Sequence, residues 1–270
     1  MTVNPASGNV PLLEFDSDRS AFIDPAKTQP KVDAPAAAIA CFFPETIEEM
    51  TSQGHRVLEL PSREPLWEIE YRGKRLGLFY PGLGAPLASN SMERVIAAGC
   101  RTIIACGGAG AMRQDLRMGH HAIVVTAAVR DEGTSYHYLP PAREVVASPD
   151  VVAALTAVVN RRGIPTIAGR TWTTDGLFRE TPRRVARRRA EGCLTVEMEA
   201  SALLAVAEFR SIQFGQLLYA GDDLSGEVWD DRDWRQAVEV RRLLVDLAAE
   251  TALALANPGQ ASAGSLKAES

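Results

Sequence analysis

Short apolar runs rich in β-branched residues alternate along most of the chain with longer stretches rich in Ala, Leu, Arg and Glu. The short runs are typical of buried strands, and the longer stretches repeat apolar residues at helical spacing. This alternation predicts an α/β domain built round a central sheet. We expect strands at 36–43, 67–71, 75–80, 102–106, 122–128, 166–172, 194–198 and 216–220, and helices at 44–53, 88–98, 149–162, 182–191, 199–209 and about 231–256.

The two ends of the chain differ from the region between them. Residues 1–30 mix Pro, Asp and Ser without sustained periodicity, which predicts an N-terminal arm. Residues 257–270 are mostly small and polar, which predicts a flexible C-terminal tail. Because one hydrophobic core can serve roughly 250–300 residues, we expect a single domain over 31–256. Gly73 follows one short apolar run and precedes the next, so a hairpin turn is expected there.

Composition narrows the classes of protein that remain. An apolar fraction of 46% is enough for a folded core, and no apolar run approaches the roughly 20 residues of a membrane-spanning helix. No basic and apolar leader is visible at the start, so we expect a cytoplasmic protein. The four cysteines form no Cys-x-x-Cys pair and the histidines lack metal-ligand spacing, so reduced, mostly buried thiols and no metal are expected. With a net charge of −5, the arginine-rich stretch 179–189 favours a solvated helix face over a nucleic-acid site.

Two polar or glycine-rich segments follow predicted strands. In one, the strand 102–106 leads into Gly107-Gly108-Ala109-Gly110, where glycines would let a ligand approach the backbone, although a tight turn explains them as well. In the other, a polar and aromatic run from Arg130 to Pro140 follows an apolar strand. Loops at strand ends are where α/β enzymes place ligands, but a long surface loop has the same composition.

Two carboxylates flank Met198 where a predicted strand becomes a predicted helix. In extended backbone, residues two apart point to the same side, so Glu197 and Glu199 can face one pocket. The alternative is that both cap the helix, whose amino end favours negative charge.

A second acidic pair, Asp222-Asp223, ends the strand predicted at 216–220. A carboxyl group there is a candidate proton donor, and a turn or helix-cap aspartate is the alternative.

Read together, these segments resemble the nucleoside phosphorylase superfamily, which includes uridine phosphorylases, hexameric purine nucleoside phosphorylases and methylthioadenosine nucleosidases. The most specific parts are residues 196–200, residues 130–138 and the glycine segment 107–110, and the resemblance covers about 35–256. It implies a single α/β domain with a twisted mixed sheet flanked by helices. It also implies a homodimer or homohexamer with shared active sites, which cleaves the N-glycosidic bond of a nucleoside without a cofactor.

The resemblance also implies roles for individual residues. Glu199 is similar to the carboxylate that binds the ribose hydroxyls, with Met198 beneath the sugar and Glu197 beside it. Asp222 resembles the aspartate that protonates a leaving purine, although Gly221 stands where a serine is usual and leaves Asp223 as an alternative acid. The base pocket is expected in 170–180, with Trp172 and Phe178 as nucleobase contacts beside Asp222. A purine or modified base is favoured, because the residues with which uridine phosphorylases read uracil are not clearly matched.

The expected phosphate site departs most from the family pattern. The segment after the first strand carries acids, including Glu45, and Ala105 stands in place of an arginine. Gly108, Arg130 and an Arg63 donated by a neighbouring subunit are the remaining candidate phosphate ligands. Phosphorolysis to free base and ribose 1-phosphate is therefore the first hypothesis, with inorganic phosphate as co-substrate. A hydrolytic nucleosidase and a non-catalytic nucleoside-binding protein are the alternatives.

Overall fold

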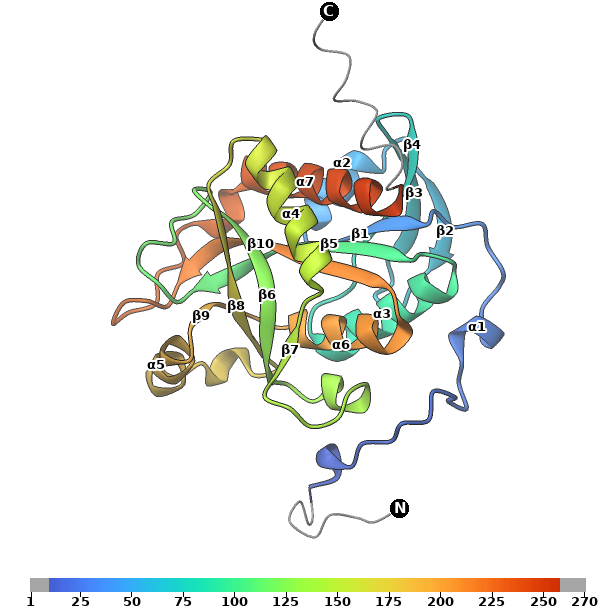
Figure 1. Cartoon of the computed structure of the whole chain (residues 1–270). Helices are drawn as coiled ribbons and strands as arrows, with labels where there is room; N and C mark the ends of the chain where they lie inside the picture. The colour runs from blue at the N-terminus through green and yellow to red at the C-terminus, as the bar shows by residue number, and fades with distance from the viewer. Residues whose placement is uncertain (1–9, 258–270) are drawn as a thin grey trace, which may run out of the picture.

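Ten strands form one mixed sheet in the computed structural model, which describes residues 10–257 (Figure 1). Eight of these strands lie at the positions that the sequence predicts, and the two short strands β2 and β7 are additional. The strands are β1 Ala37–Cys41, β2 His55–Glu59, β3 Pro65–Tyr71, β4 Lys74–Phe79, β5 Thr102–Ala111, β6 Ala122–Asp131, β7 Glu144–Val146, β8 Thr166–Thr174, β9 Cys193–Glu197 and β10 Gln213–Asp223.

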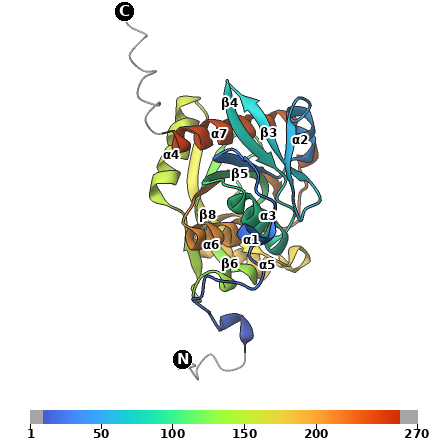
Figure 2. The ribbon, with the colours of Figure 1, turned by 90° about the vertical axis from the view of Figure 1, so that its right-hand side faces the viewer.

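Helices cover both faces of the sheet (Figures 1 and 2). On one face α2, α4 and α7 bury apolar side chains such as Leu155 and Leu247, and on the other α3 and α6 bury Met92 and Leu203. These two clusters form the main core, as the alternation along the chain predicts. The helices are α1 Pro25–Thr28, α2 Pro44–Met50, α3 Ala85–Ala97, α4 Pro149–Arg161, α5 Pro182–Ala190, α6 Ala200–Arg210 and α7 Val238–Ala256, with 3₁₀ turns η2 Pro11–Leu13, η3 Thr134–His137, η4 Leu177–Arg179 and η5 Trp234–Gln236.

Five of the strands close into a ring. The sheet order is β10-β6-β8-β9-β5-β1-β4-β3-β2, and β10 also pairs with β5. Along the other edge of β5, β1 pairs as far as Cys106, and β9 pairs only from Gly110. The intervening residues 107–109 therefore lie between the ends of two neighbouring strands, which leaves an opening beside them.

The glycine segment belongs to β5 rather than to a turn after it. A Cβ on Gly108 would lie 3.1 Å from the Tyr219 ring, and one on Gly110 would lie 2.4 Å from Leu224. Side chains from β10 and the segment after it occupy the space that a Cβ would need at these two residues. The strand itself continues past the predicted end at 106 to Ala111. The predicted hairpin is confirmed, with β3 and β4 antiparallel and Gly73 at φ +73°.

The N-terminal segment runs along the α3 and α6 side of the molecule (Figures 1 and 2). Within it α1 packs on α3, and the Gln29 side chain donates to the Arg94 carbonyl at 3.1 Å. Residues 1–9 of the predicted arm and 258–270 of the predicted tail lie outside the described residues. No helix within 10–257 has the length and apolar character needed to cross a membrane.

Candidate active site

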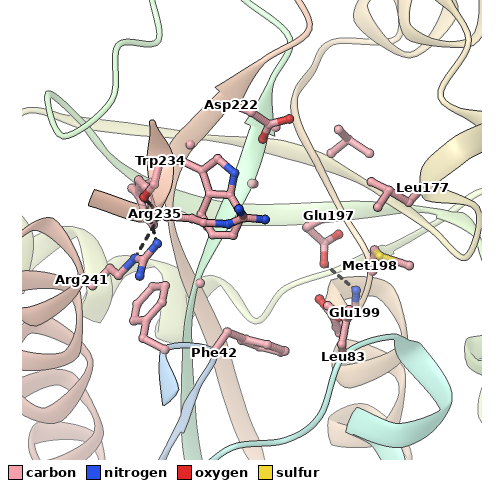
Figure 3. A pocket seen from close by; sticks show the side chains of 18 of the residues that line it. Phe42, Leu83, Leu177, Glu197, Met198, Glu199, Asp222, Trp234, Arg235 and Arg241 are labelled. Carbon is pink, nitrogen blue, oxygen red and sulfur yellow. Dashed lines mark hydrogen bonds between the residues drawn. The ribbon is translucent and has the colours of Figure 1, made fainter. Parts of the chain in front are cut away.

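A cavity of about 670 Å³ lies at the opening beside β5 (Figure 3). Its walls come from the segments after β1 and β4, from residues 107–110 of β5, from the β9–α6 junction and from the end of β10 with η5. All of these segments except the middle of β5 follow strands, so the cavity lies at strand ends, where α/β folds bind ligands. The residues used below are Phe42, Glu45, Gly108, Leu177, Glu180, Glu197, Met198, Glu199, Tyr219, Asp222, Trp234, Arg235 and Arg241.

Glu197 holds the start of helix α6 in place. Its Oε2 accepts from the backbone N–H groups of Glu199 at 2.7 Å and Ala200 at 2.6 Å, and its Oε1 accepts from the Thr173 hydroxyl at 2.6 Å. Burial raises the pKa of Glu197 to about 7 against these three donors. The capping alternative therefore describes Glu197 well: it lines the cavity, but its hydrogen bonds are directed into the protein.

Glu199 is held differently from Glu197. Its Oε1 accepts from the backbone N–H of Gly84 at 2.6 Å, which ties it to the segment before α3. The carboxyl group lines the cavity, where it can accept hydrogen bonds from a ligand (Figure 3). Burial, together with the nearby charge of Glu197, raises the pKa of Glu199 to about 8. A ligand that donates hydrogen bonds would favour the ionised form of this carboxyl.

The two aspartates at the end of β10 face different surroundings. Asp222 lines the cavity, and its Oδ2 accepts from the Trp229 indole N–H at 2.7 Å. Asp223 forms an ion pair with Arg232. Although burial acts to raise it, hydrogen bonds from Ser225 and the charge of Arg232 hold the pKa of Asp223 below its usual range. Of the two candidate acids, Asp222 is the one that the fold brings to the cavity.

Leu177 and Glu180 complete the wall near Asp222. Burial and the neighbouring Asp222 raise the pKa of Glu180 to about 7, against the opposing effect of Arg184. Two carboxyl groups thus share one end of the cavity, and burial and the charge of Asp222 favour the protonated form of Glu180.

The opposite wall contains two arginines. Arg241 is buried and uses all three of its nitrogens: it contacts Glu45, donates to the Trp234 carbonyl at 2.9 Å and donates to the Tyr219 hydroxyl at 3.3 Å. Arg235 lies in η5, the 3₁₀ turn that precedes α7, and its guanidinium carbon is 5.4 Å from the centre of the Trp234 ring. Among the described residues, Arg235 forms no ion pair.

The structure places both predicted aromatic base contacts outside the cavity. Trp172 is fully buried in a separate apolar cluster, and its indole N–H donates to Asp131 at 3.0 Å. Successive residues of a strand face opposite sides of the sheet. Since the Thr173 side chain contacts Glu197 at the cavity, the Trp172 side chain points away from the cavity. Phe178 is 95% exposed, and its neighbour Leu177 lines the cavity instead.

Of the predicted phosphate ligands, only Gly108 lines the cavity. Arg130 is buried and binds its own loop: it donates to the Ser135 hydroxyl at 2.8 Å and to the carbonyls of Leu139 and Pro140. Arg63 is exposed in the loop between β2 and β3 and does not line the cavity of its own subunit. The predicted donation of Arg63 by a neighbouring subunit stays a prediction.

Sequence reasoning missed Arg235 and Arg241 as cavity residues, and it included Glu180 only as the last residue of the expected base-pocket segment 170–180, without a role. Arg235 lies in 231–237, which we expected to be part of the last helix. That helix begins only at Val238, after Asp233 adopts φ +48° and η5 turns the chain. The acidic and aromatic composition of 229–235 was the available signal of a separate segment.

Comparisons with known proteins find matches over most of this chain. A family model described as "Phosphorylase superfamily" matches residues 36–256. Uridine phosphorylase of Salmonella typhimurium is 27% identical over 190 residues, which cover 64% of this chain and 75% of that protein. Guanosine phosphorylase of Halorubrum lacusprofundi is 26% identical, over 68% of this chain and 78% of that protein.

Solved structures show the same fold. Uridine phosphorylase from Vibrio fischeri superposes with a TM-score of 0.69 at 23% identity, and the match covers 82% of this chain and 92% of that one. Purine nucleoside phosphorylase from Toxoplasma gondii in complex with immucillin-H has the same TM-score at 22% identity, with 81% and 92% covered.

Proposed function

Since this chain belongs to the phosphorylase superfamily, we propose that it cleaves the N-glycosidic bond of a nucleoside by phosphorolysis. The observation that carries the proposal is that Glu199, Met198 and Asp222 line one cavity beside the glycine segment of β5. Relatives named uridine, guanosine and purine nucleoside phosphorylases support phosphate, rather than water, as the nucleophile. Phosphate is then the second substrate, and the reaction needs no cofactor.

In the proposed reaction a phosphate oxygen bonds to C1′ of the ribose as the bond from C1′ to the base nitrogen breaks. The electron pair leaves with the base, which takes up a proton from Asp222. The Glu199 carboxylate, which lines the cavity, accepts hydrogen bonds from the ribose hydroxyls, and these contacts strengthen as positive charge develops on the sugar. Burial raises the pKa of Glu180 to about 7, so a proton is available near Asp222 at neutral pH.

We also propose a purine nucleoside as the substrate. Two carboxyl groups, Asp222 and Glu180, lie at one end of the cavity, and carboxyl groups can both donate a proton to a ring nitrogen and accept from N–H groups. The homo-oligomer with shared sites, the cytoplasmic location and a role in purine salvage stay predictions.

The test is release of free base from a panel of purine and pyrimidine nucleosides, with and without phosphate, with the sugar product identified by mass. Ribose 1-phosphate that appears only with phosphate is the expected result. Free ribose released at the same rate in both conditions would instead establish a hydrolase. Tight nucleoside binding by calorimetry without base release would establish a binding protein.

A further inference from the structure

Acidic side chains outnumber the two arginines, Arg235 and Arg241, among the residues that line the cavity. Three carboxyl groups, those of Glu199, Glu180 and Asp222, face it without a cationic partner within 4 Å among residues 10–257. Two further acids line the cavity. Glu197 accepts hydrogen bonds from the backbone of the α6 start, and Glu45 is paired with Arg241. A phosphate dianion would be poorly held in such a site without a cation, because an unpaired charge in a partly desolvated cavity costs free energy and any ionised carboxyl repels it. Phosphorolysis therefore requires a cation with free donors.

Arg241 meets this requirement poorly, because three of its five N–H donors and its charge are already engaged by the protein. Its contacts with Glu45, the Trp234 carbonyl and the Tyr219 hydroxyl occupy all three nitrogens. The first of these contacts also cancels its charge. Arg235 differs in both respects: within the described part of the chain its guanidinium lies over the ring of Trp234 and forms no ion pair.

The turn that carries Arg235 is firmly built. Arg241 holds the Trp234 carbonyl, and Trp234 lies against Gly221, with its Cβ 3.5 Å from the point where a Cβ on that glycine would lie. On the preceding side, Arg232 binds Asp223 and donates to the Leu116 carbonyl at 2.7 Å. Anchors on both sides of η5 fix the position of its backbone and leave the Arg235 side chain directed to the cavity (Figure 3).

We propose that Arg235 is the residue with which this cavity binds inorganic phosphate, in place of cations on the segments after β1 and before the glycines of β5. The planar guanidinium offers paired N–H donors that match two oxygens of a phosphate. The inference rests on the proposed phosphorolysis. The same chemistry would bind the 5′-phosphate of a nucleotide substrate, so the experiment has to distinguish the two sources.

The experiment compares the wild-type protein with Arg235→Gln and Arg235→Lys, using the best nucleoside of the panel at varied phosphate concentrations. We expect Arg235→Gln to raise the KM for phosphate roughly ten- to a hundredfold, the effect of losing a charge-assisted hydrogen bond, and to leave the KM for the nucleoside unchanged. Arg235→Lys, which keeps the charge but not the fork, should give a smaller loss.

Arg242→Gln is the matched control. Arg242 is also an arginine of this region, but it pairs with Glu49 and Glu239 on the surface and does not line the cavity. Its removal changes the net charge by the same amount, and we expect no change in the KM for phosphate.

Each other result has a distinct meaning. An unchanged KM for phosphate in Arg235→Gln overturns the inference while phosphorolysis stands. If wild-type base release needs no phosphate, phosphorolysis fails, and calorimetry with inorganic phosphate alone decides the inference: binding that Arg235→Gln abolishes supports it, and no binding overturns it. Faster cleavage of a nucleoside 5′-monophosphate than of the nucleoside, lost only in Arg235→Gln, assigns the arginine to the nucleotide and also overturns the inference.

Discussion

At the scale of single residues, the two ends of the cavity differ in what they offer a reacting nucleoside. Asp222 is held by the Trp229 indole at one end, and Glu199 is held by the Gly84 amide at the other. Each carboxylate keeps one anchored oxygen, so its position is set before a ligand arrives. Such preorganisation is what allows a charged group to act on a transition state without rearranging.

Replacement of Asp222 by Asn should lower kcat, because the amide cannot donate a carboxylic proton to the leaving base. Loss of a general acid typically costs about 10²–10⁴-fold in rate. The measurement is kcat on the best natural nucleoside beside kcat on a ribosyl substrate whose leaving group needs no proton, such as a nitrophenyl riboside. The activated substrate should be nearly unaffected, and an equal loss on both substrates would show that Asp222 has another role.

Replacement of Glu199 by Gln should abolish turnover and stabilise the protein at high pH. Burial raises the pKa of Glu199 from about 4.5 to about 8, so the folded state holds this proton more tightly than the unfolded state. The stability it contributes is complete below pH 4.5 and is lost as the pH rises through 8. We expect the variant to melt several degrees above wild type at pH 8.5, because each unit of pKa shift corresponds to about 1.4 kcal/mol and 1 kcal/mol shifts the melting temperature by roughly 2–4 °C in a protein of about this size. At pH 4.5 the two melting temperatures should agree, and a constant difference across this range would contradict the assignment.

At the scale of elements, the junction between β9 and α6 joins the core to the site. Glu197 is the last residue of β9, caps α6 and accepts a hydrogen bond from the Thr173 hydroxyl of β8. The next two residues, Met198 and Glu199, line the cavity. One carboxylate therefore fixes the register of three elements at the point where the sugar is proposed to bind.

Replacement of Glu197 by Ala should reduce stability as well as activity. Two backbone N–H groups at the start of α6 and the Thr173 hydroxyl would lose their acceptor, and a lost helix cap costs about 0.5–2 kcal/mol. Urea unfolding measures this loss. Thr181→Ala is a useful comparison, because Thr181 caps α5 away from the cavity and its loss should lower stability without changing the KM for the nucleoside. Full stability in Glu197→Ala would show that the cap is unimportant.

Much of the fold and the acidic part of the site could be predicted from the sequence. The run of residues 194–203 reveals both the strand-to-helix junction and its two carboxylates, because these features are local. The aromatic base contacts could not be assigned in the same way. Trp172 and Phe178 lie near cavity residues in the sequence, but strand alternation buries one and η4 turns the other outward. Arg235 could not be assigned to the cavity from the sequence, because the position of its turn depends on contacts with side chains and backbone of β10 and α7 rather than on local sequence.

At the scale of the whole molecule, the exposed Arg63 raises the question of whether one subunit completes another. It lies in the loop between β2 and β3, outside the cavity of its own subunit. Its backbone is in the left-handed region, at φ +64°, so the loop presents it in a defined tight turn.

If a neighbouring subunit donates Arg63, two inactive variants should restore each other's activity. Arg63→Ala and Glu199→Gln chains, mixed after mild unfolding and refolding, would form mixed dimers in which one of the two sites carries neither change. Random pairing would recover about a quarter of the wild-type sites, as two-fold symmetry dictates. The readout is base release from the mixture relative to each variant alone. No recovery, with mixed dimers confirmed by mass spectrometry, would show that each site is complete within one chain.

The closure of β10 onto both β5 and β6 also has a consequence for biosynthesis. Residues 213–223 leave the ribosome about a hundred residues after the strands β5 and β6 with which they pair. Pairings so distant in sequence form late and slowly in folding. Because this strand also carries Asp222, a nascent chain released before residue 213 lacks the proposed proton donor as well as the closing strand. Incomplete products of translation would therefore be catalytically silent rather than partly active.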